Sequence, residues 1–275
     1  MELLMFARKV KCRVLENIGV NESVFVIRFA PSKKFSYQPG QFISVLVPSN
    51  TRKGKTVKRC YSLASSPAES KYHNQYEICV KLVPGGKGST YLSDLRKGDV
   101  FFAEAAFGGF TYQPPAPGRS VVFICTGTGI GPFRSMVRSE EFLSNPPPDS
   151  MCFFGVRYDS ELVYRKTFEA SGVKTLCAVS RPSEHWSGFK GRVTDLLRSM
   201  PRDWKWHSTD FYICGSGEMS DEVIEILQAG HGVSPSAIYR ENFTSPTYPQ
   251  KPEVAAEQST EDQLLPFPLP FKQAA

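Results

Sequence analysis

The sequence lacks the patterns that mark metal-binding, disulfide-stapled and membrane-spanning proteins. Its cysteines are scattered, with no two within four residues of each other, at positions 12, 60, 79, 125, 152, 177 and 214. Zinc and iron–sulfur sites are built from closely spaced cysteines, so no metal site is expected. An odd, scattered set also argues against a disulfide framework. No apolar run approaches the roughly 18 residues of a membrane helix, so membrane insertion is not expected.

A strong charge of one sign is also missing, although the charge is unevenly distributed. The formal net charge is +6, made up of +9 over residues 1–118 and −3 over residues 119–275. This asymmetry indicates two domains with different partners. Nucleic acid is not expected among them, because no helix-turn-helix, zinc-finger or RNA-binding aromatic motif accompanies the basic half. The first ten residues do not resemble a secretory signal, so we expect a cytoplasmic protein. The oligomeric state is not indicated.

The order of local patterns predicts two domains and a tail. A proline-rich break, QPPAPGR at 113–119, separates domains expected at 1–114 and 119–243, and six prolines in the last 31 residues mark a tail at 244–275. The first domain contains short runs rich in Val, Ile, Phe and Tyr separated by turn residues, which predict a small β-barrel or sandwich. The second domain alternates strands, expected over 120–125, 151–156, 175–179 and 211–214, with helices expected over 132–143, 162–170, 193–199 and 220–230. This alternation predicts a doubly wound parallel sheet with ligands at the strand ends.

Two glycine-rich strings follow predicted strands of the second domain. CTGTGIGPFRSM at 125–136 follows the apolar run VVFI, and CGSGEM occupies 214–219. Glycine permits close backbone approach and proline fits a first helical turn, so free N–H groups would point at an anion. The spacing is neither the dinucleotide fingerprint G-x-G-x-x-G nor a Walker loop. A phosphate-binding turn is therefore indicated, without an identified ligand.

The string RCYSLASSP at 59–67 places an arginine, an aromatic ring and a hydroxyl close together in a predicted strand. Arg59 and Tyr61 would share one face and Ser62 the other. Arginine suits bidentate phosphate binding, tyrosine offers a flat surface to a ring, and serine can bond a ring nitrogen. Composition alone favours an ordinary amphipathic strand.

Taken in order, these motifs resemble the ferredoxin–NADP⁺ reductase superfamily over roughly residues 8–243. R-x-Y-S is its flavin motif, PGQF and VPGGKGSTYL match its neighbouring segments, and the two glycine strings match its nicotinamide-domain turns. The resemblance implies an α+β two-domain fold: an antiparallel β-barrel that binds FAD, then an α/β doubly wound parallel-sheet domain that binds NADP. The chain departs from the family pattern in three places. The segment EAAFGGF at 104–110 lacks the usual proline, and Gly217 stands where many members carry proline. The chain also continues about 30 residues past Phe243.

The same resemblance implies roles for individual residues. Ser62, near flavin N5, and Cys214, near the nicotinamide, are the expected catalytic residues. Arg59 is expected to bind the flavin diphosphate and Tyr61 to pack on the flavin. The remaining cofactor-binding residues are expected on both domains, at Val80, Gly88, Ser89, Thr90, Gly127, Thr128, Gly129, Gly215 and Met219.

The nicotinamide cofactor is predicted to be NADP(H). The strand at 175–179 is followed by Ser180 and Arg181, and Arg192 comes shortly after. A hydroxyl and two guanidinium groups near an adenosine ribose would neutralise a 2′-phosphate, whereas an acidic residue there would favour NAD. Ordinary surface arginines would explain the same residues.

The resemblance implies an FAD-dependent oxidoreductase that transfers hydride between NADPH and FAD, and single electrons to or from a ferredoxin- or flavodoxin-type carrier. The alternatives are the reductase component of an oxygenase system and a flavin-bound, non-catalytic interaction module. We also expect the basic loop 49–59, with Lys33 and Lys34, to steer an acidic carrier, the alternatives being a solvated hairpin loop or adenosine-phosphate contacts. The tail string LLPFPLPF is expected to cover the flavin or a neighbouring subunit, the alternative being a disordered end without function.

Overall fold

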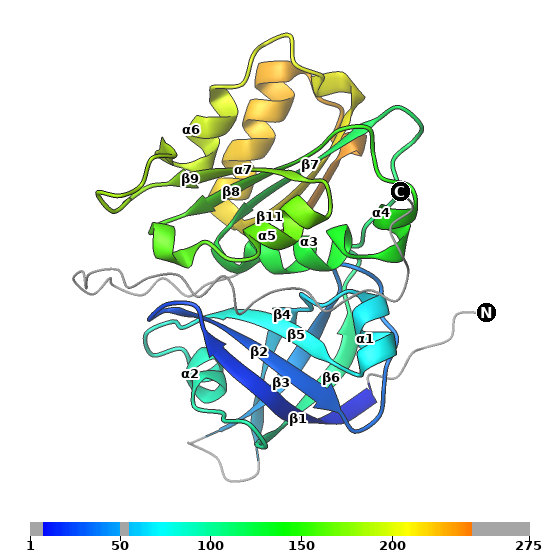
Figure 1. Cartoon of the computed structure of the whole chain (residues 1–275), viewed down its shortest axis with the longest axis vertical. Coiled ribbons are helices and arrows are strands. Elements are labelled where there is room, and N and C mark those ends of the chain that lie inside the picture. Colours follow the sequence, from blue (N-terminus) through cyan, green and yellow to red (C-terminus); the bar gives the residue numbers. More distant parts are fainter. Residues whose placement is uncertain (1–7, 50–54, 244–275) are drawn as a thin grey trace.

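The computed structural model describes residues 8–49 and 55–243, which form two domains stacked end to end (Figure 1). The last strand of the first domain ends at Phe107, and the first strand of the second domain begins at Ser120. The expectations about the tail 244–275, and about Arg52 and Lys53 in the basic loop, lie outside the described residues.

The first domain is a six-stranded antiparallel sheet in the order β4-β3-β6-β1-β2-β5. A bridge between Leu63 and Ile78 joins the end of β4 to β5 and curls the sheet into a barrel. Alternate residues such as Val10 and Cys12 point into the core, because successive strand side chains face opposite sides. Its elements are β1 (Arg8–Gly19), β2 (Val24–Pro31), β3 (Phe42–Pro48), β4 (Thr56–Ser62), α1 (Pro67–His73), β5 (Tyr76–Lys81), α2 (Lys87–Ser93) and β6 (Val100–Phe107).

The second domain is a six-stranded sheet in the order β10-β9-β8-β7-β11-β12, and its strand pairs are all parallel. Its strands are β7 (Ser120–Thr126), β8 (Ser150–Val156), β9 (Lys174–Val179), β10 (Phe189–Lys190), β11 (Thr209–Ser216) and β12 (Ile238–Phe243). The chain runs outward from β7 to β10 and then returns to the other side of β7. This reversal lies between β7 and β11, where open α/β sheets bind ligands.

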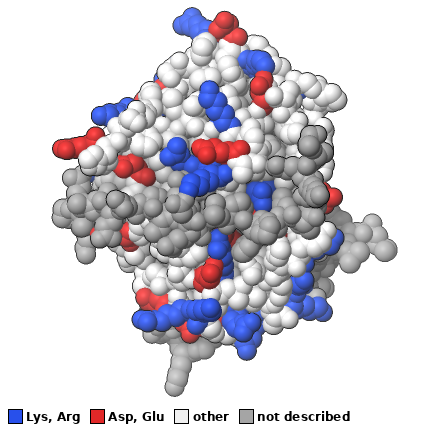
Figure 2. Space-filling view, in the orientation of Figure 1, with Lys and Arg blue, Asp and Glu red and all other residues white. Residues whose placement is uncertain are grey.

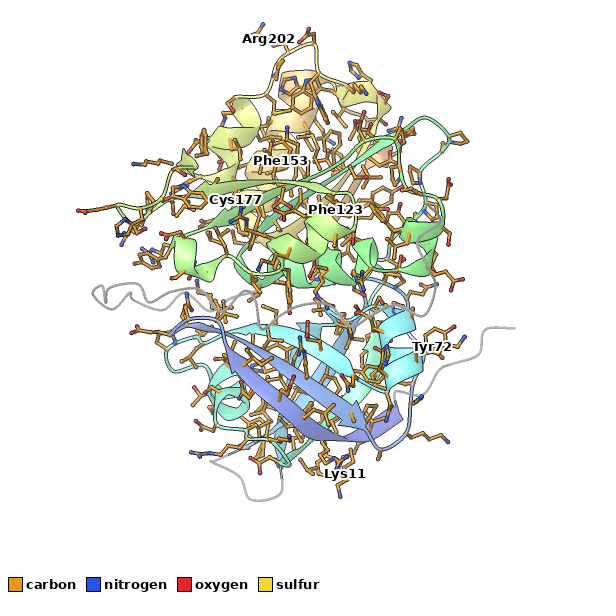
Figure 3. All side chains as sticks on the ribbon, viewed as in Figure 1. Lys11, Tyr72, Phe123, Phe153, Cys177 and Arg202 are labelled. Atoms are coloured by element: carbon orange, nitrogen blue, oxygen red, sulfur yellow. The ribbon has the colours of Figure 1, made fainter. Side chains whose placement is uncertain are left out.

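Helices cover both faces of this sheet. The helices are α3 (Ile130–Val137), α4 (Glu140–Ser144), α5 (Arg165–Ala170), α6 (Val193–Arg198) and α7 (Gly217–Glu225), with a π turn at Ile226–Gly230 and 3-10 turns at Gly127–Gly129, Asp159–Glu161, Trp206–Ser208 and Pro235–Ala237. Phe123 packs in the layer that contains α3 and α4, and Phe153 packs with α6 and α7 (Figure 3). The doubly wound prediction is confirmed.

Several element boundaries differ from the prediction. The helix expected over 132–143 is split at Ser139, whose Oγ accepts a hydrogen bond from Phe142 N (3.2 Å) and so begins a new helix, α4. The helix expected over 162–170 begins only at Arg165. The helix expected over 220–230 begins at Gly217, because Ser216 caps its first turn. Helix α1 and the strands β6, β10 and β12 were not predicted.

The α3 layer of the second domain packs directly on the barrel. One apolar cluster contains Val24 and Ala64 of the barrel together with Ile130 and Phe133 of α3. Because α3 follows the glycine turn at the end of β7, this contact brings that turn to the end of strand β4. The fold therefore joins the two regions that the sequence motifs singled out.

Candidate functional site

Strand β4 and the start of helix α2 form a cradle on the barrel. Gly88 lies so close to β4 that an added Cβ would come within 2.7 Å of both Arg59 Cγ and Tyr61 Oη. Any larger residue would fill this space. Arg59 is exposed, and among the described residues it donates only to its neighbour's carbonyl, Lys58 O (2.8 Å). Burial raises the pKa of Tyr61 to about 12 and keeps its phenol neutral. A dinucleotide would fit here, because the Arg59 guanidinium is exposed, the Tyr61 ring is neutral and Gly88 leaves space beside them.

The other predicted flavin residues take different positions. Ser89 Oγ accepts a hydrogen bond from Val83 N (3.0 Å), so this hydroxyl holds the turn before α2. Thr90 is exposed on the first turn of the helix. Val80 is 1% exposed and belongs to the barrel core, against which Tyr61 packs.

At the junction of the domains, Ser62 meets strand β12. Ser62 Oγ donates to Glu241 Oε2 (3.3 Å), and Glu241 pairs in register with Cys214 of the neighbouring strand β11. The two predicted catalytic residues are thus brought to one place by a glutamate to which the sequence argument gave no role. The contact could not be expected from the sequence, because strand β12 was not predicted and Ser62 lies 179 residues from Glu241.

The electrostatics of this cluster make Glu241 its titrating group. Burial raises the pKa of Glu241 to about 7, against a smaller opposing effect of the Ser62 hydrogen bond. Burial, and secondarily the Glu241 charge, raises the pKa of the Cys214 thiol well above its ordinary value. Cys214 therefore stays a neutral thiol, and Glu241 exchanges a proton near neutral pH.

The two glycine-rich strings pack against one another at the sheet reversal. A Cβ on Gly129 would lie 2.3 Å from Cys214 O, and one on Gly215 would lie 2.3 Å from Thr126 Oγ1. Gly127 has a φ of +53°, a conformation that favours glycine. Thr128 is half-buried in the turn, and the Cε of the buried Met219 would lie 2.6 Å from a Cβ on Gly215. The glycines let both strand ends approach closely.

The predicted adenosine-side residues gather at the next strand ends. Ser180 N donates to Val156 O (3.1 Å) and Arg181 N donates to Arg157 O (2.7 Å), so the chain after β9 lies along the chain after β8. Gly191 N donates to Val179 O (2.9 Å), which brings Arg192 to the same edge. Ser180, Arg181 and Arg192 are all exposed. Arg157, which the sequence argument did not single out, adds a third arginine.

Two acidic residues near this edge already bond backbone N–H groups: Asp195 Oδ2 accepts a hydrogen bond from Arg192 N (2.9 Å), and Asp159 is held by the loop that contains Ser183. Asp159 accepts hydrogen bonds from Ser183 N (2.8 Å) and Ser183 Oγ (3.0 Å), and these bonds hold the pKa of its carboxyl below the ordinary value although burial opposes them. The oxygens of Asp159 serve the loop, and the exposed side chains of the edge include those of Ser180, Arg181 and Arg192, with Glu184 and Asp195 also exposed close by in the sequence. The edge therefore suits an anion.

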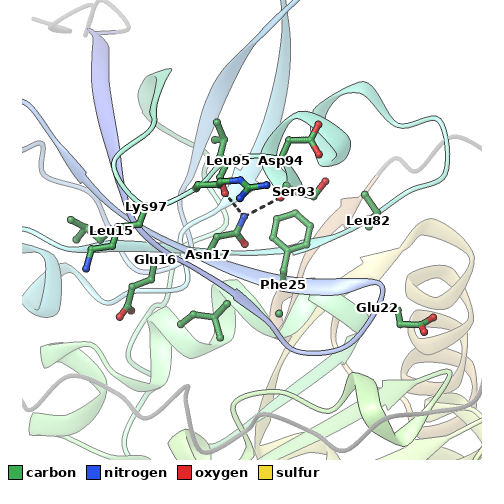
Figure 4. Close-up of a pocket in the computed structure, with 13 residues that line it drawn as sticks. Leu15, Glu16, Asn17, Glu22, Phe25, Leu82, Ser93, Asp94, Leu95 and Lys97 are labelled. Atoms are coloured by element: carbon green, nitrogen blue, oxygen red, sulfur yellow. Dashed lines mark hydrogen bonds between the residues drawn. The ribbon is translucent and has the colours of Figure 1, made fainter.

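One hollow of the described surface lies away from these residues. It has a volume of about 970 Å³ and is lined by the β1–β2 hairpin and the chain that follows α2 (Figure 4). Inside it, Asn17 Nδ2 donates to the carbonyls of Leu92 (3.3 Å), Ser93 (3.3 Å) and Leu95 (2.8 Å), which ties the hairpin to the end of α2. None of the expected cofactor-binding residues lines it.

Within residues 8–49 and 55–243, no helix is long and apolar enough to cross a membrane. In the same ranges, no group of three or more His, Cys, Asp or Glu side chains could hold a metal ion. All seven cysteines are free thiols.

Comparisons with known proteins give two family matches, one for each domain. Residues 11–112 match the oxidoreductase FAD-binding domain, and residues 123–224 match the oxidoreductase NAD-binding domain. Among curated proteins, ferredoxin–NADP reductase B of Sorangium cellulosum is 31% identical over 223 residues, which cover 78% of this chain and 88% of that protein.

A second relative is longer than this chain. The glycine betaine monooxygenase reductase subunit of Pseudomonas aeruginosa is 28% identical over 81% of this chain, but the match spans only 59% of that protein. Among solved structures, a ferredoxin NADP⁺ reductase from Neisseria gonorrhoeae with bound FAD and NADP superposes with a TM-score of 0.73 at 20% identity, covering 86% of this chain and 99% of that one. At this identity the structural likeness supports the fold alone.

Proposed function

The chain belongs to the ferredoxin–NADP⁺ reductase superfamily, and from that premise we propose that it carries reducing equivalents from NADPH through FAD to a ferredoxin- or flavodoxin-type carrier. It is an oxidoreductase with an FAD-binding and an NAD(P)-binding domain. When bound, FAD accepts hydride from a nicotinamide and releases electrons singly. The observation that carries the proposal is the junction where Ser62 of the barrel meets Glu241 beside Cys214.

On the barrel side, three residues of the cradle would hold the flavin. The Arg59 guanidinium would hold the diphosphate with charge-assisted hydrogen bonds, Tyr61 would pack on the flavin, and Gly88 leaves the space between them. The backbone of Ser89 and the hydroxyl of Thr90 would add donors. Val80 supports the cradle from the core.

On the other side, the paired glycine turns would receive the nicotinamide. Gly127, Thr128 and Gly129 would face it from β7, while Cys214 and Gly215 would face it from β11, with Met219 beneath. The neutral Cys214 thiol excludes water without adding charge. Glu241 can hold a proton at Oε2 and accept the Ser62 hydrogen bond when ionised, so the pair can move a proton across the junction.

The proposed cofactor is NADP(H). Ser180, Arg181 and Arg192 share one exposed edge with Arg157, and Asp159 is engaged by Ser183. Guanidinium groups bind phosphate more tightly than they bind a ribose hydroxyl. A 2′-phosphate is therefore the ligand that this edge suits best. Scattered free thiols suit a reducing compartment, so we also place the protein in the cytoplasm.

A second candidate function is the reductase component of an oxygenase system. The similarity to an oxygenase reductase subunit favours it, since the residues of the junction would serve both functions. The chain spans 59% of that relative's length, so the two proteins differ in extent. A non-catalytic flavin module would need neither the nicotinamide turns nor the Ser62–Glu241 contact.

The carrier step distinguishes these functions. The FAD-loaded protein is reduced anaerobically with a stoichiometric amount of NADPH and mixed in a stopped-flow instrument with ferredoxin, flavodoxin or a Rieske protein. Rapid reoxidation of the flavin by ferredoxin or flavodoxin supports the proposal. Reoxidation by the Rieske protein alone would assign the chain to an oxygenase system. Failure of every carrier would contradict both functions.

A further inference from the structure

A buried ion network joins the two domains next to the proposed site. Arg134 of α3 is completely buried, and its Nη1 donates to Ala64 O (2.7 Å) and to Glu69 Oε2 (3.1 Å). Glu69 lies on α1 of the barrel and is also fully buried. One helical turn further on, Arg138 Nε donates to Glu69 Oε1 (3.2 Å). Two arginines of the α/β domain therefore share one carboxylate of the barrel.

A second buried carboxylate extends the network. Glu77 of β5 lies 3.5 Å from Arg134 Nε and accepts hydrogen bonds from Arg28 Nε (2.8 Å) and Tyr164 Oη (2.9 Å). Arg134 also lies over the ring of Tyr164, 5.1 Å from its centroid. Burial opposes ionisation of Glu77, but Arg134 and Arg28 hold its pKa below the ordinary value. Glu77 therefore stays charged between the domains.

Arg134 is connected to both halves of the proposed site. Its helix begins at Ile130, directly after the glycine turn 127–129, and its hydrogen bond reaches Ala64, two residues after Ser62. Ala64 in turn donates its own N–H to Glu77 O (2.7 Å), so the end of β4 is fixed from both sides. The Arg134 side chain thus links the glycine turn 127–129, the proposed nicotinamide turn, to strand β4, the proposed flavin strand.

Contact between the two domains does not require the charge of Arg134. The apolar cluster of Val24, Ala64, Ile130 and Phe133 already joins the domains, and at the rim Lys81 Nζ contacts Glu161 Oε1 at 2.7 Å. A buried ion pair is weak evidence for stability, because desolvation offsets much of its attraction, but it can fix one relative placement of two elements. The hydrogen bond from Arg134 to the Ala64 carbonyl is directional, so it can fix the placement of α3 relative to the barrel.

We propose that Arg134 is a positioning residue that sets the distance between the nicotinamide turn and the flavin strand. The inference rests on the proposed function and adds a residue that contacts neither the cradle nor the 2′-phosphate edge. A displacement of about 1 Å between reacting groups can slow a reaction about a hundredfold. Removing Arg134 should therefore slow transfer between the cofactors and leave the affinity for the adenosine half of NADP unchanged.

The test compares Arg134→Met with Arg28→Met. Arg28 bonds the same carboxylate, Glu77, but lies wholly in the barrel, so it controls for the loss of a buried charge. For each FAD-loaded protein we would measure FAD content, thermal midpoint, affinity for 2′-phospho-AMP, the charge-transfer absorbance formed when NADP⁺ is added to the dithionite-reduced flavin, and flavin reduction at saturating NADPH. Arg134→Met should keep the 2′-phospho-AMP affinity, lose the charge-transfer band and reduce flavin about a hundredfold more slowly. Arg28→Met should keep both band and rate.

The inference would be overturned by an unchanged band and rate in Arg134→Met, or by an equal loss in Arg28→Met. If Arg134→Met does not fold, Arg134→Lys and Glu69→Gln carry the same comparison, because each keeps the volume of the site while weakening the bonds. Amide exchange at residues 127–131 gives a readout independent of activity and should be faster in each Arg134 variant than in Arg28→Met. If NADPH fails to reduce the wild-type flavin, the proposed function fails, whereas unchanged exchange would refute only the role of Arg134.

Discussion

Glu241 shows how burial at the domain junction creates a group that titrates near neutral pH. Its carboxyl has one hydrogen-bond donor in the described structure, Ser62 Oγ, and burial raises its pKa to about 7. The folded state therefore holds a proton that the unfolded chain releases at a lower pH. The sign of the linkage follows: the associated stability is present below the unfolded pKa and is lost as pH rises through about 7.

We predict that Glu241→Gln changes the pH dependence of stability. Glutamine mimics the neutral carboxyl and does not ionise. Between pH 5 and pH 8 the wild type should lose roughly 2–3 kcal/mol of its free energy of unfolding as Glu241 ionises, and the variant should not. Denaturant unfolding at pH 5 and pH 8 measures the difference. Parallel stability curves for the two proteins would show that the carboxyl titrates as it does in the unfolded chain.

At the adenosine edge, Arg181 and Arg192 should determine cofactor preference. Replacing both with alanine should raise the KM for NADPH far more than that for NADH, because each charge-assisted phosphate contact is worth about 1.5–3 kcal/mol. Arg198→Ala is a matched control, since Arg198 is the last residue of α6 and its guanidinium already pairs with Glu222 (2.7 Å) and Asp195 (3.7 Å). A wild-type enzyme that uses NADH as well as NADPH would contradict the assignment.

At the scale of elements, the cradle depends on the close packing of α2 on β4. Gly88→Ala would place a methyl group 2.7 Å from Arg59 Cγ and Tyr61 Oη, so one of these side chains must move. We expect the variant to lose FAD during gel filtration, as Arg59→Ala should. Gly19→Ala is the control, because a Cβ there meets nothing within 4 Å. Equal FAD content in the Gly88 and Gly19 variants would argue against the cradle.

The predicted elements were those with strong local signals. Alternating β-branched and aromatic residues indicated β1 to β5, and the glycine strings marked the ends of β7 and β11, so the two-domain fold was predictable. Helix α1 was missed although Ser66 and Glu69 form a capping box that the sequence displays. Strand β6 (VFFAEAAF) contains alanine and glutamate, which weaken a strand pattern. Strand β12 (IYRENF) is short and carries charged residues at the sheet edge.

The candidate site was only partly predictable for a different reason. Arg59, Tyr61 and Gly88 could be inferred because each lies in a local motif. Contacts that join distant segments leave no such signal, and the pairs of Ser62 with Glu241 and of Arg134 with Ala64 are 179 and 70 residues apart. Only the packing of the domains brings these partners together.

At the scale of the whole molecule, charge is distributed differently in the two domains. On the face shown in Figure 2, basic and acidic side chains lie beside one another, although the first 118 residues carry +9 in total. Two of the residues expected to steer a carrier have local partners: Lys34 Nζ donates to Lys71 O (2.8 Å) and Lys58 Nζ pairs with Glu104 (2.6 Å). Such exposed contacts are weak, so both charges still contribute to the long-range field.

Electrostatic steering predicts a difference between the two half-reactions. Electron transfer to an acidic carrier should slow steeply as ionic strength rises from about 0.01 M to 1 M, because the Debye length falls from about 30 to 3 Å. Reduction of the flavin by saturating NADPH should change much less, since the nicotinamide is already bound. Equal salt dependence of both steps would refute steering by the basic domain.

The most direct test of a nicotinamide held against a flavin at the domain junction is single-turnover reduction without oxygen. The FAD-loaded protein is mixed anaerobically with excess NADPH, or with excess NADH, and the flavin absorbance is followed with time. We predict that NADPH bleaches the flavin completely in a fast phase preceded by a charge-transfer band, and that NADH does so more slowly and only at higher concentration. Flavin that stays bound and oxidised with both nucleotides would contradict this arrangement.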